Sequence, residues 1–366
     1  MKALTMGVEE EFVLVDRTSR APVDRAPEVI RAAARELGEQ VQAEFYNAQI
    51  EISTQPTTSC RALRDELAWL RAVVARASHA GHCRPVASGT PVLPPEKPLT
   101  ITDTERYRRM ASHFASLVYP YSGLDSGCHV HVGTFDRETA LALAHHMRPW
   151  LPVLQALAAN SPYAERRDTG FHSWRSIEHA RWPTVGPAPL LDEAQYLAHV
   201  TALVDDGTLL DRRMIYWYAR PSEHVPTLEI RVADVNADLD TVVLLAALVR
   251  GLAGTLLPDV EAEAPPPAVP LPRLLRAHGL AAAHGLAGMG LDPEDGTERP
   301  ATELVERLVA RAGPGLDAAG DTAWVKDCWE RVRATGGGAA HQRAVYRRNG
   351  RFSAVVDAVA AVTVTA

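Results

Sequence analysis

The sequence predicts an α+β fold, in which a β-sheet is flanked by helices and followed by a helical C-terminal part. In the first two thirds of the 366 residues, short segments alternate apolar and polar residues, as strands with one buried face do. Longer segments with apolar residues three or four apart predict the helices. An acidic, proline-rich stretch at 259–272 is typical of a semi-rigid linker, and it separates a main domain at 1–258 from a helical part at 273–366 that we expect to pack on it.

The strand predictions depend on this alternation and on residues that end a strand. In 6–15, apolar residues alternate with acidic ones before a turn-forming segment that starts at Asp16. Pro56 lies just beyond the second predicted strand, and proline cannot donate a hydrogen bond to a sheet. The predicted strands are 6–15, 49–54, 85–90, 128–133 and 228–232.

The helix predictions depend on periodicity and capping. Ser59 is a good N-cap for a helix at 60–80 whose apolar residues lie on one side. Residues 240–257 are mostly apolar, which predicts a helix that is largely buried, whereas glycines 336–338 predict a flexible connector. The polar, aromatic-rich stretch at 161–189 predicts a long ordered loop. Further helices are predicted at 28–37, 136–146, 149–159, 274–283, 301–312, 322–333 and 354–362.

Composition and charge argue against several classes of protein. Hydrophobic residues make up 46% of the chain and charged residues 23%, so it should fold on its own. The net charge of −7 provides no basic field for nucleic acid. The four cysteines form no CxxC pair, and three acidic residues stand where a signal peptide needs its apolar core. No apolar run approaches the roughly 20 residues that span a bilayer, and we therefore predict a cytoplasmic protein without a nucleic-acid or membrane partner.

Ionisable residues recur two positions apart on the predicted strands, and residues so spaced point to the same side of a strand. Glu51 lies alone between two isoleucines, on the side opposite to theirs. The pairs are Glu9 with Glu11, His129 with His131, and Glu229 with Arg231.

Each pair also has a simpler explanation. The two glutamates of the first strand fit a solvated edge strand, and the two histidines fit the outer face of an antiparallel sheet. Glu229 and Arg231 fit a surface ion pair. The occurrence of four such strands in one chain favours a shared site instead.

A shared site with this many carboxylates requires positive charge, because burying an unpaired carboxylate is costly. A divalent metal ion provides it. Oxygen-rich ligand sets with one or two imidazoles suit Mg²⁺ or Mn²⁺ that hold nucleotide phosphates. Arg231, two residues after Glu229, is then placed to meet the phosphate that the metal ions bridge.

Longer motifs occur in a fixed order along the chain. They are GVEEEF at 7–12, QIEISTQP at 49–56, GCHVHVG at 127–133, ANSPY at 159–163, RDTGFHSWRS at 167–176, and RPSEHVPTLEIRVADVN at 220–236. Together they closely resemble the type 2 glutamate–cysteine ligase family of carboxylate–amine ligases. AHQRAVYRRNGRFSAVVDAV at 340–359 resembles the tail of that family, so the resemblance covers nearly the whole chain.

The resemblance implies that residues 1–258 form a glutamine-synthetase-like catalytic domain, a curved antiparallel β-sheet around the nucleotide, with ATP and Mg²⁺ or Mn²⁺ as cofactors. By motif position it implies that Glu51, Glu229 and Arg231 are catalytic and that Arg231 steadies the transferring γ-phosphate. His131 and Arg231 would bind the nucleotide. Ser173 and Arg175 would bind substrate carboxylates, with a structural ion pair as the alternative. The implied metal ligands are Glu9, Glu11, Glu51, His129 and Glu229.

The founding activity of the family joins the γ-carboxylate of glutamate to the amine of cysteine through an acyl phosphate, forming γ-glutamylcysteine, ADP and phosphate. The resemblance implies this reaction, with a small carboxylate and an amine as partners, and base rates for soluble enzymes favour a homodimer. The alternatives are a ligase that joins another carboxylate and amine, and a nucleotide-binding protein that has lost catalysis. Ala164, where many relatives carry tryptophan, leaves the acceptor open. Segments 91–103 and 161–189 are candidates for a loop that excludes water.

Overall fold

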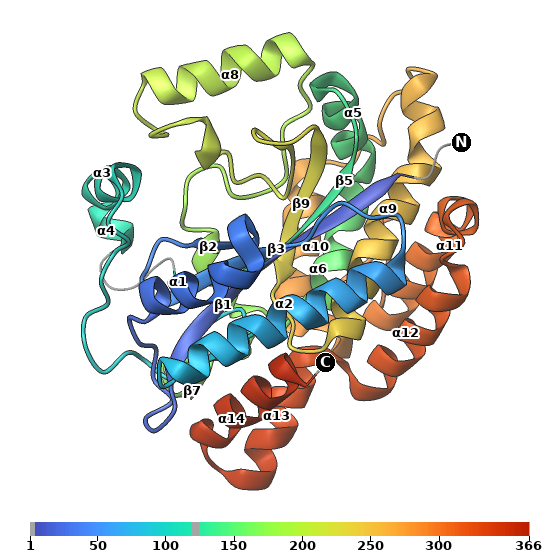
Figure 1. The fold of residues 1–366 in the computed structure, drawn as a ribbon. Helices are drawn as coiled ribbons and strands as arrows, with labels where there is room; N and C mark the ends of the chain where they lie inside the picture. The colour runs from blue at the N-terminus through green and yellow to red at the C-terminus, as the bar shows by residue number, and fades with distance from the viewer. Residues whose placement is uncertain (1–3, 119–123, 366) are drawn as a thin grey trace.

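The computed structural model describes residues 4–118 and 124–365. In this part of the chain, seven antiparallel strands form the central sheet in the order β2–β3–β1–β5–β9–β8, with β4 paired to β1 (Figure 1). The strands are β1 (Thr5–Asp16), β2 (Val41–Ala43), β3 (Gln49–Ser53), β4 (Cys83–Val86), β5 (Gly127–Gly133), β8 (Ala219–Pro221) and β9 (Thr227–Asp234). The predicted α+β fold with an antiparallel sheet is confirmed.

Helices cover the apolar face of this sheet. Val8, Val130 and Ile230 share one core with Leu244 and Leu248 of the central helix α9. The helices of this layer are α1 (Ala26–Leu37), α2 (Cys60–Ala80), α5 (Arg137–Met147), α6 (Leu151–Ala158) and α9 (Leu239–Glu261). The opposite face of the sheet is left for the ionisable side chains.

Helix α9 is long and apolar enough to cross a membrane, by length and composition only, with a mean hydropathy of 1.8 over its most apolar window. Of that window, 78% is buried inside the protein, chiefly against α11 and α12 and against α5. The prediction of a largely buried helix is confirmed. The statement that no apolar run approaches a bilayer-spanning length was wrong, because a helix packed on all sides needs the same apolar composition as a membrane span.

The C-terminal helices pack on this layer and close one end of the sheet. Val355 and Val359 pack against Val13 and Val15, which lie on the same face of β1 as Glu9 but further along the strand. These helices are α10 (Leu271–His284), α11 (Ala301–Ala319), α12 (Thr322–Thr335), α13 (Gly337–Asn349) and α14 (Phe352–Val364), coloured orange to red in Figure 1. The ionisable half of that face therefore stays open while its other half is covered.

Several local predictions were wrong. Strand β4 begins at Cys83 and ends at Val86, so residues 87–90 are not a strand. Gly336 ends α12 with a φ of 77°, and Gly337 begins α13, so these glycines separate two helices rather than form a flexible connector. The stretch 161–189 is not a plain loop, because it contains the hairpin strands β6 (Tyr163–Ala164) and β7 (Arg167–Asp168) and helix α7 (Trp174–His179).

Other short elements escaped prediction. Helices α3 (Glu105–His113) and α8 (Glu193–Asp205) start after Thr104 and Asp192, whose side chains accept hydrogen bonds from the first turn. Those N-caps were the available signal. The remaining elements are α4 (Ala115–Val118), β10 (Met289–Leu291), β11 (Glu298–Pro300), and the 3₁₀ helices η1 (Gly38–Gln40), η2 (Arg148–Trp150), η3 (Arg212–Met214) and η4 (Gly285–Ala287).

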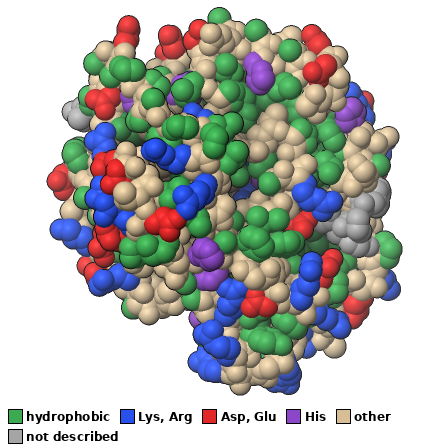
Figure 2. Space-filling model, turned by 180° about the vertical axis from the view of Figure 1, so that it is seen from behind, with side chains coloured by type: hydrophobic (Ala, Val, Ile, Leu, Met, Phe, Trp, Pro, Cys, Tyr) green, Lys and Arg blue, Asp and Glu red, His purple; other side chains and the backbone are tan. Residues whose placement is uncertain are grey.

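Charged side chains of both signs are mixed on the surface. Figure 2 shows Lys and Arg side chains beside Asp and Glu side chains over much of one face. Many of them form exposed ion pairs, such as Arg25 with Glu28 and Arg333 with Glu330. Exposed pairs of this kind contribute little to stability, on the order of 0–1 kcal/mol each.

Candidate active site

The open face of the sheet lines a cavity of about 900 Å³, a size typical of small-molecule sites. Aromatic residues outside the sheet also line it, among them Phe45, Tyr107, Trp182 and Tyr216. These side chains belong to or pack against a separate apolar cluster beyond the sheet. The cavity therefore has a charged floor, and its other walls combine these aromatic rings with ionisable side chains such as Arg106, Asp125 and Arg175.

The strand register places the ionisable residues opposite one another on this floor. Glu9 on β1 pairs with His129 on β5, and Glu11 on β1 pairs with Glu51 on β3. His131 on β5 faces a glutamate, Glu229, on β9. The face shared by each predicted pair is thus the same face for all four strands.

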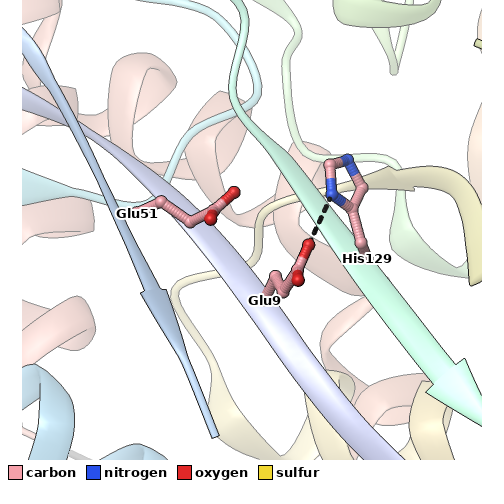
Figure 3. Close-up of side chains that lie close together, drawn as sticks. All are labelled: Glu9, Glu51 and His129. Atoms are coloured by element: carbon pink, nitrogen blue, oxygen red, sulfur yellow. Dashed lines mark hydrogen bonds and ion pairs between the residues drawn. The ribbon is translucent and has the colours of Figure 1, made fainter. Parts of the chain in front are cut away.

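The contacts within this cluster join Glu9 to both histidines. Its Oε2 lies 3.4 Å from Nδ1 of His129, and its Oε1 lies 3.4 Å from Nε2 of His131. Figure 3 shows Glu9 and Glu51 on neighbouring strands and His129 beyond Glu9. Glu11 accepts a hydrogen bond from the backbone N–H of Gly127 at 2.5 Å, and its Oε1 is 3.8 Å from Nε2 of His129.

Glu229 is the most buried of the cluster carboxylates, with 2% of its surface exposed. Arg220 donates to it from Nε at 2.8 Å and from Nη2 at 3.2 Å, and Arg231 donates to its Oε1. Arg231 also stands over the Tyr216 ring, with Cζ 5.7 Å from the centroid. Both guanidinium groups are therefore oriented by one carboxylate and face the cavity.

The donor set fits divalent metal ions. Glu9, Glu51 and His129 bring ligand atoms within 4.8 Å of one another, as do Glu9, His131 and Glu229. Nε2 of His129 and Nε2 of His131 are buried and have no hydrogen-bond partner among the described residues. Carboxylate oxygens with one or two imidazoles suit Mg²⁺ or Mn²⁺.

The sequence predictions missed Glu44, which follows the short strand β2. Its ligand atom lies within 4.8 Å of those of Glu11 and Glu51. Strand β2 pairs with β3, which brings Glu44 to the floor of the cavity. Because β2 has three residues and its last two are exposed, it lacked the alternation that identified the other strands.

Burial and crowding change the acidity of the carboxyls. Burial and then the charge of Glu11 raise the pKa of Glu44 to about 8. Burial and then the charge of Glu9 raise the pKa of Glu51 well above its usual value. At Glu9, contact with the two imidazoles outweighs burial and lowers the pKa. The two histidines therefore already stabilise the ionised carboxylate of Glu9. The carboxyls of Glu44 and Glu51 instead hold protons that a metal ion would displace.

Neighbouring charges also shift the pKa values of Glu229 and His129. At Glu229, the charges of Arg220 and Arg231 outweigh burial and hold the pKa well below its usual range. Burial and then the charge of Arg231 lower the pKa of His129, so its imidazole is neutral, as a metal ligand must be.

Comparison with known proteins identifies the family. The model of the glutamate–cysteine ligase family 2 matches residues 5–358. The chain belongs to this family. A protein of Salinispora arenicola provisionally named glutamate–cysteine ligase 2 is 42% identical over 99% of this chain and 96% of its own length. A Nocardia farcinica protein provisionally named glutamate–cysteine ligase 2-1 is 42% identical over 99% of this chain and 94% of its own length. The predicted family and enzyme class, a carboxylate–amine ligase, are confirmed.

Solved structures agree in fold. A crystal structure of glutamate–cysteine ligase from Francisella tularensis in complex with AMP superposes with a TM-score of 0.72, over 100% of this chain and 89% of that chain. A bifunctional glutathione synthetase from Pasteurella multocida gives 0.68 over 98% of this chain and 52% of that chain. Sequence identity is 14% in both, so these similarities concern the fold.

Of the two residues implied as substrate ligands, Arg175 lines the cavity and Ser173 does not. Arg175 lines the cavity and is 3% exposed, with Nε 3.9 Å from Asp125 Oδ2. Its guanidinium lies over Gly127, where an added Cβ would come within 3.0 Å of Cζ. Ser173 is fully buried outside the cavity lining. It caps α7 and donates to Asp234 at 2.7 Å, so its visible role is to attach α7 to β9.

Two other expectations can be compared with the cavity. Ala164, the residue that left the acceptor open, is buried in β6 and is not among the residues that line the cavity. No residue of 91–103 lines the cavity either, whereas 161–189 contributes Arg175, His179 and Trp182. The second of the two candidate covering segments is therefore the one in contact with the site.

Glu10, which lies between Glu9 and Glu11 on β1, points to the opposite face of the sheet. Glu10 is fully buried on the helix-covered face, where Arg71 donates to both of its carboxylate oxygens, at 2.5 and 2.9 Å. Arg71 also donates to the backbone carbonyls of Asn236 and Ala237. Adjacent glutamates thus have different roles, because Glu10 stabilises the fold through Arg71 while Glu9 and Glu11 face the cavity.

Proposed function

We propose that this protein is an ATP- and Mg²⁺-dependent glutamate–cysteine ligase that activates the γ-carboxylate of glutamate as an acyl phosphate. The amine of cysteine then displaces phosphate to form γ-glutamylcysteine. The observation that carries the proposal is the alignment of five ligand side chains and Arg231 on one face of the sheet inside a cavity. The names of the Salinispora and Nocardia relatives, and the AMP complex of the Francisella ligase, support the substrates and the nucleotide.

The metal ligands in this proposal are the predicted five together with Glu44. Bound Mg²⁺ would offset the charge of the nucleotide phosphates and polarise the transferred γ-phosphoryl group. The chain contributes the fixed orientation of the ligands, since Glu9 is held between two imidazoles and Glu11 by the Gly127 N–H. Thr227 lies 2.8 Å from Nδ1 of His131 and fixes that ring, which leaves its Nε2 facing Glu9.

Arg231 would stabilise charge on the equatorial oxygens of the γ-phosphoryl group during transfer. Glu229 and the Tyr216 ring hold its guanidinium in place, so little reorganisation is needed when the phosphoryl group arrives. Arg220 shares the same carboxylate. The aromatic side chains that line the cavity would limit water near the acyl phosphate, which protects that intermediate from hydrolysis.

The proposal is tested by phosphate release from ATP and Mg²⁺ in the presence of glutamate, with cysteine added or withheld. Cysteine-dependent release with a matching γ-glutamyl product is the expected result. Release with another carboxylate or amine would retain the chemistry and replace the substrates. ATP binding without turnover across a panel of both would favour the non-catalytic alternative. With these substrates, the enzyme would act in the cytoplasm, where ATP and reduced thiols are present.

A further inference from the structure

A second buried pair of polar side chains, which is not part of the carboxylate cluster, lines the same cavity. Nδ1 of His179, the last residue of α7, lies 2.9 Å from Oδ2 of Asp125. The side chain of Asp125 is 8% exposed and that of His179 is 15% exposed. Both ring nitrogens of His179 are buried, and neither completes a hydrogen bond of good geometry with a described residue; Nδ1 is in close contact with Asp125, whereas Nε2 faces no polar partner. A carboxylate on one ring nitrogen leaves the other nitrogen available to a ligand.

We propose that His179 is the base that takes a proton from the acceptor amine, and that Asp125 is its positioning residue. This inference depends on the proposed ligase reaction and adds a residue to it. An amine with an ordinary pKa is largely an ammonium ion at neutral pH, and an ammonium ion has no lone pair for attack. A group that accepts its proton inside the cavity is therefore required for coupling but not for phosphoryl transfer.

The position of His179 suits the second half of the reaction. Its ring centroid is 5.7 Å from that of Tyr216, and the same Tyr216 ring has Arg231 Cζ 5.7 Å from its centroid. His179 and Arg231 thus flank one aromatic side chain on the cavity wall. A substrate bound against the Tyr216 ring would therefore be near both His179 and Arg231, and none of the metal-ligand groups among the described residues includes His179.

The charged groups around His179 keep it ready to accept a proton. Burial and then the charges of Arg175 and Arg231 lower its pKa, against the opposing charge of Asp125, so the ring is neutral at pH 7. The contact with His179 and the charge of Arg175 outweigh burial and lower the pKa of Asp125, so that carboxylate stays ionised. The Tyr216 hydroxyl is neutral, because burial raises its pKa. An ionised Asp125 favours the tautomer with the proton on Nδ1, which leaves a lone pair on Nε2.

The proton balance of the step is simple. The ammonium ion gives one proton to Nε2 of His179, and the neutral amine attacks the acyl carbon. The C–N bond forms, the bond from carbon to the phosphate oxygen breaks, and the second proton of the nitrogen leaves with the phosphate as hydrogen phosphate. His179 then returns its proton to solvent, so the products are the amide, hydrogen phosphate and one released proton.

The test compares two nucleophiles in the wild type and in His179→Gln, with glutamate, ATP and Mg²⁺ present. Hydroxylamine is already largely neutral at pH 7, and its product, a hydroxamate, reports formation of the acyl phosphate. We expect His179→Gln to keep hydroxamate formation near the wild-type rate and to lose cysteine coupling by about 100-fold or more. The coupling rate of the variant should then rise about tenfold per pH unit towards the pKa of the amine.

Retained hydroxamate formation would also show that the variant folds and binds ATP. An equal loss with both nucleophiles, or no loss with cysteine, would overturn the assignment of His179. His199→Gln, at an exposed histidine of α8 outside the cavity lining, is the matched control. A wild type that forms neither product would contradict the proposed function instead, so the two failures are distinguishable.

Asp125→Asn tests the positioning role separately. The amide cannot stabilise the protonated ring, so we expect a lower kcat for cysteine coupling, an unchanged KM for ATP, and a pH dependence intermediate between the wild type and His179→Gln. A change in the KM for ATP with an unchanged pH profile would indicate a structural role for Asp125 and would contradict the dyad.

Discussion

Glu11 and Glu51 lie directly opposite each other on β1 and β3, on the face of the sheet that lines the cavity. Like charges at directly opposed positions destabilise a sheet, and Glu44 adds a third carboxyl within reach. Burial and the neighbouring carboxylates raise the pKa values of Glu44 and Glu51. This crowding of carboxyls should make stability depend on pH, on Mg²⁺ and on the charge of Glu11.

Mg²⁺ should stabilise the protein more as pH rises. The pKa of Glu44 is raised from 4.5 to about 8, so the folded metal-free protein holds a proton that the unfolded chain releases above about pH 4.5. Stability of the metal-free protein should therefore fall between these pH values. Mg²⁺ displaces that proton, and its effect on Tm should be larger near pH 8 than near pH 6. Thermal unfolding with and without Mg²⁺ measures this. Glu44→Gln should give a smaller and flatter response, and an effect of Mg²⁺ that is independent of pH in the wild type would contradict the assignment.

Neighbouring glutamates of β1 should give opposite phenotypes. Glu10→Gln breaks a fully buried ion pair with Arg71, which should lower the free energy of unfolding by about 3–5 kcal/mol while leaving activity at low temperature. Glu11→Gln relieves the repulsion with Glu51, so its stability should be unchanged or higher, and its activity should fall by about 100-fold or more. Denaturant unfolding and phosphate release distinguish the two. A stable, active Glu10→Gln variant would show that Arg71 does not need its counter-charge.

Glu229→Gln should lose turnover and some stability. The change removes a ligand charge at nearly constant volume, and it leaves Arg220 and Arg231 without their buried counter-charge. We expect phosphate release to fall by about 100-fold or more and Tm to fall measurably, with the circular dichroism spectrum retained. Glu330→Gln, at an exposed position on α12, is the control. Full activity in Glu229→Gln would exclude a role for Glu229 in the metal site.

Arg231→Lys should be severely impaired although the charge is kept. An ammonium group cannot reproduce the planar fork that Glu229 and Tyr216 hold in place. We expect kcat to fall by about 100- to 1,000-fold with a smaller change in the KM for ATP. Steady-state kinetics check this against Arg333→Lys, at an exposed pair on α12. A loss below tenfold would make Arg231 a structural partner of Glu229 only.

Much of the site could be predicted because a strand has a fixed side-chain period. Glu9 and Glu11 had to share a face, as did His129 and His131, since residues i and i+2 of any strand do so. The sequence motifs then identified the family, which the comparisons confirmed. Glu44 could not be found in this way, because it follows a three-residue strand with no alternation.

By itself the sequence determined the longer strands of the sheet, the family and the faces of the predicted ligands, since these follow from local geometry and from collinear motifs. Only the tertiary structure decided which residues meet across strands. The register β1–β3 brings Glu51 opposite Glu11, and the end of α7 brings His179 to Asp125, which is 54 positions earlier in the sequence. Such contacts depend on how distant segments pack. The pKa values in turn depend on the burial and the neighbours that this packing creates. A pattern along the chain contains neither.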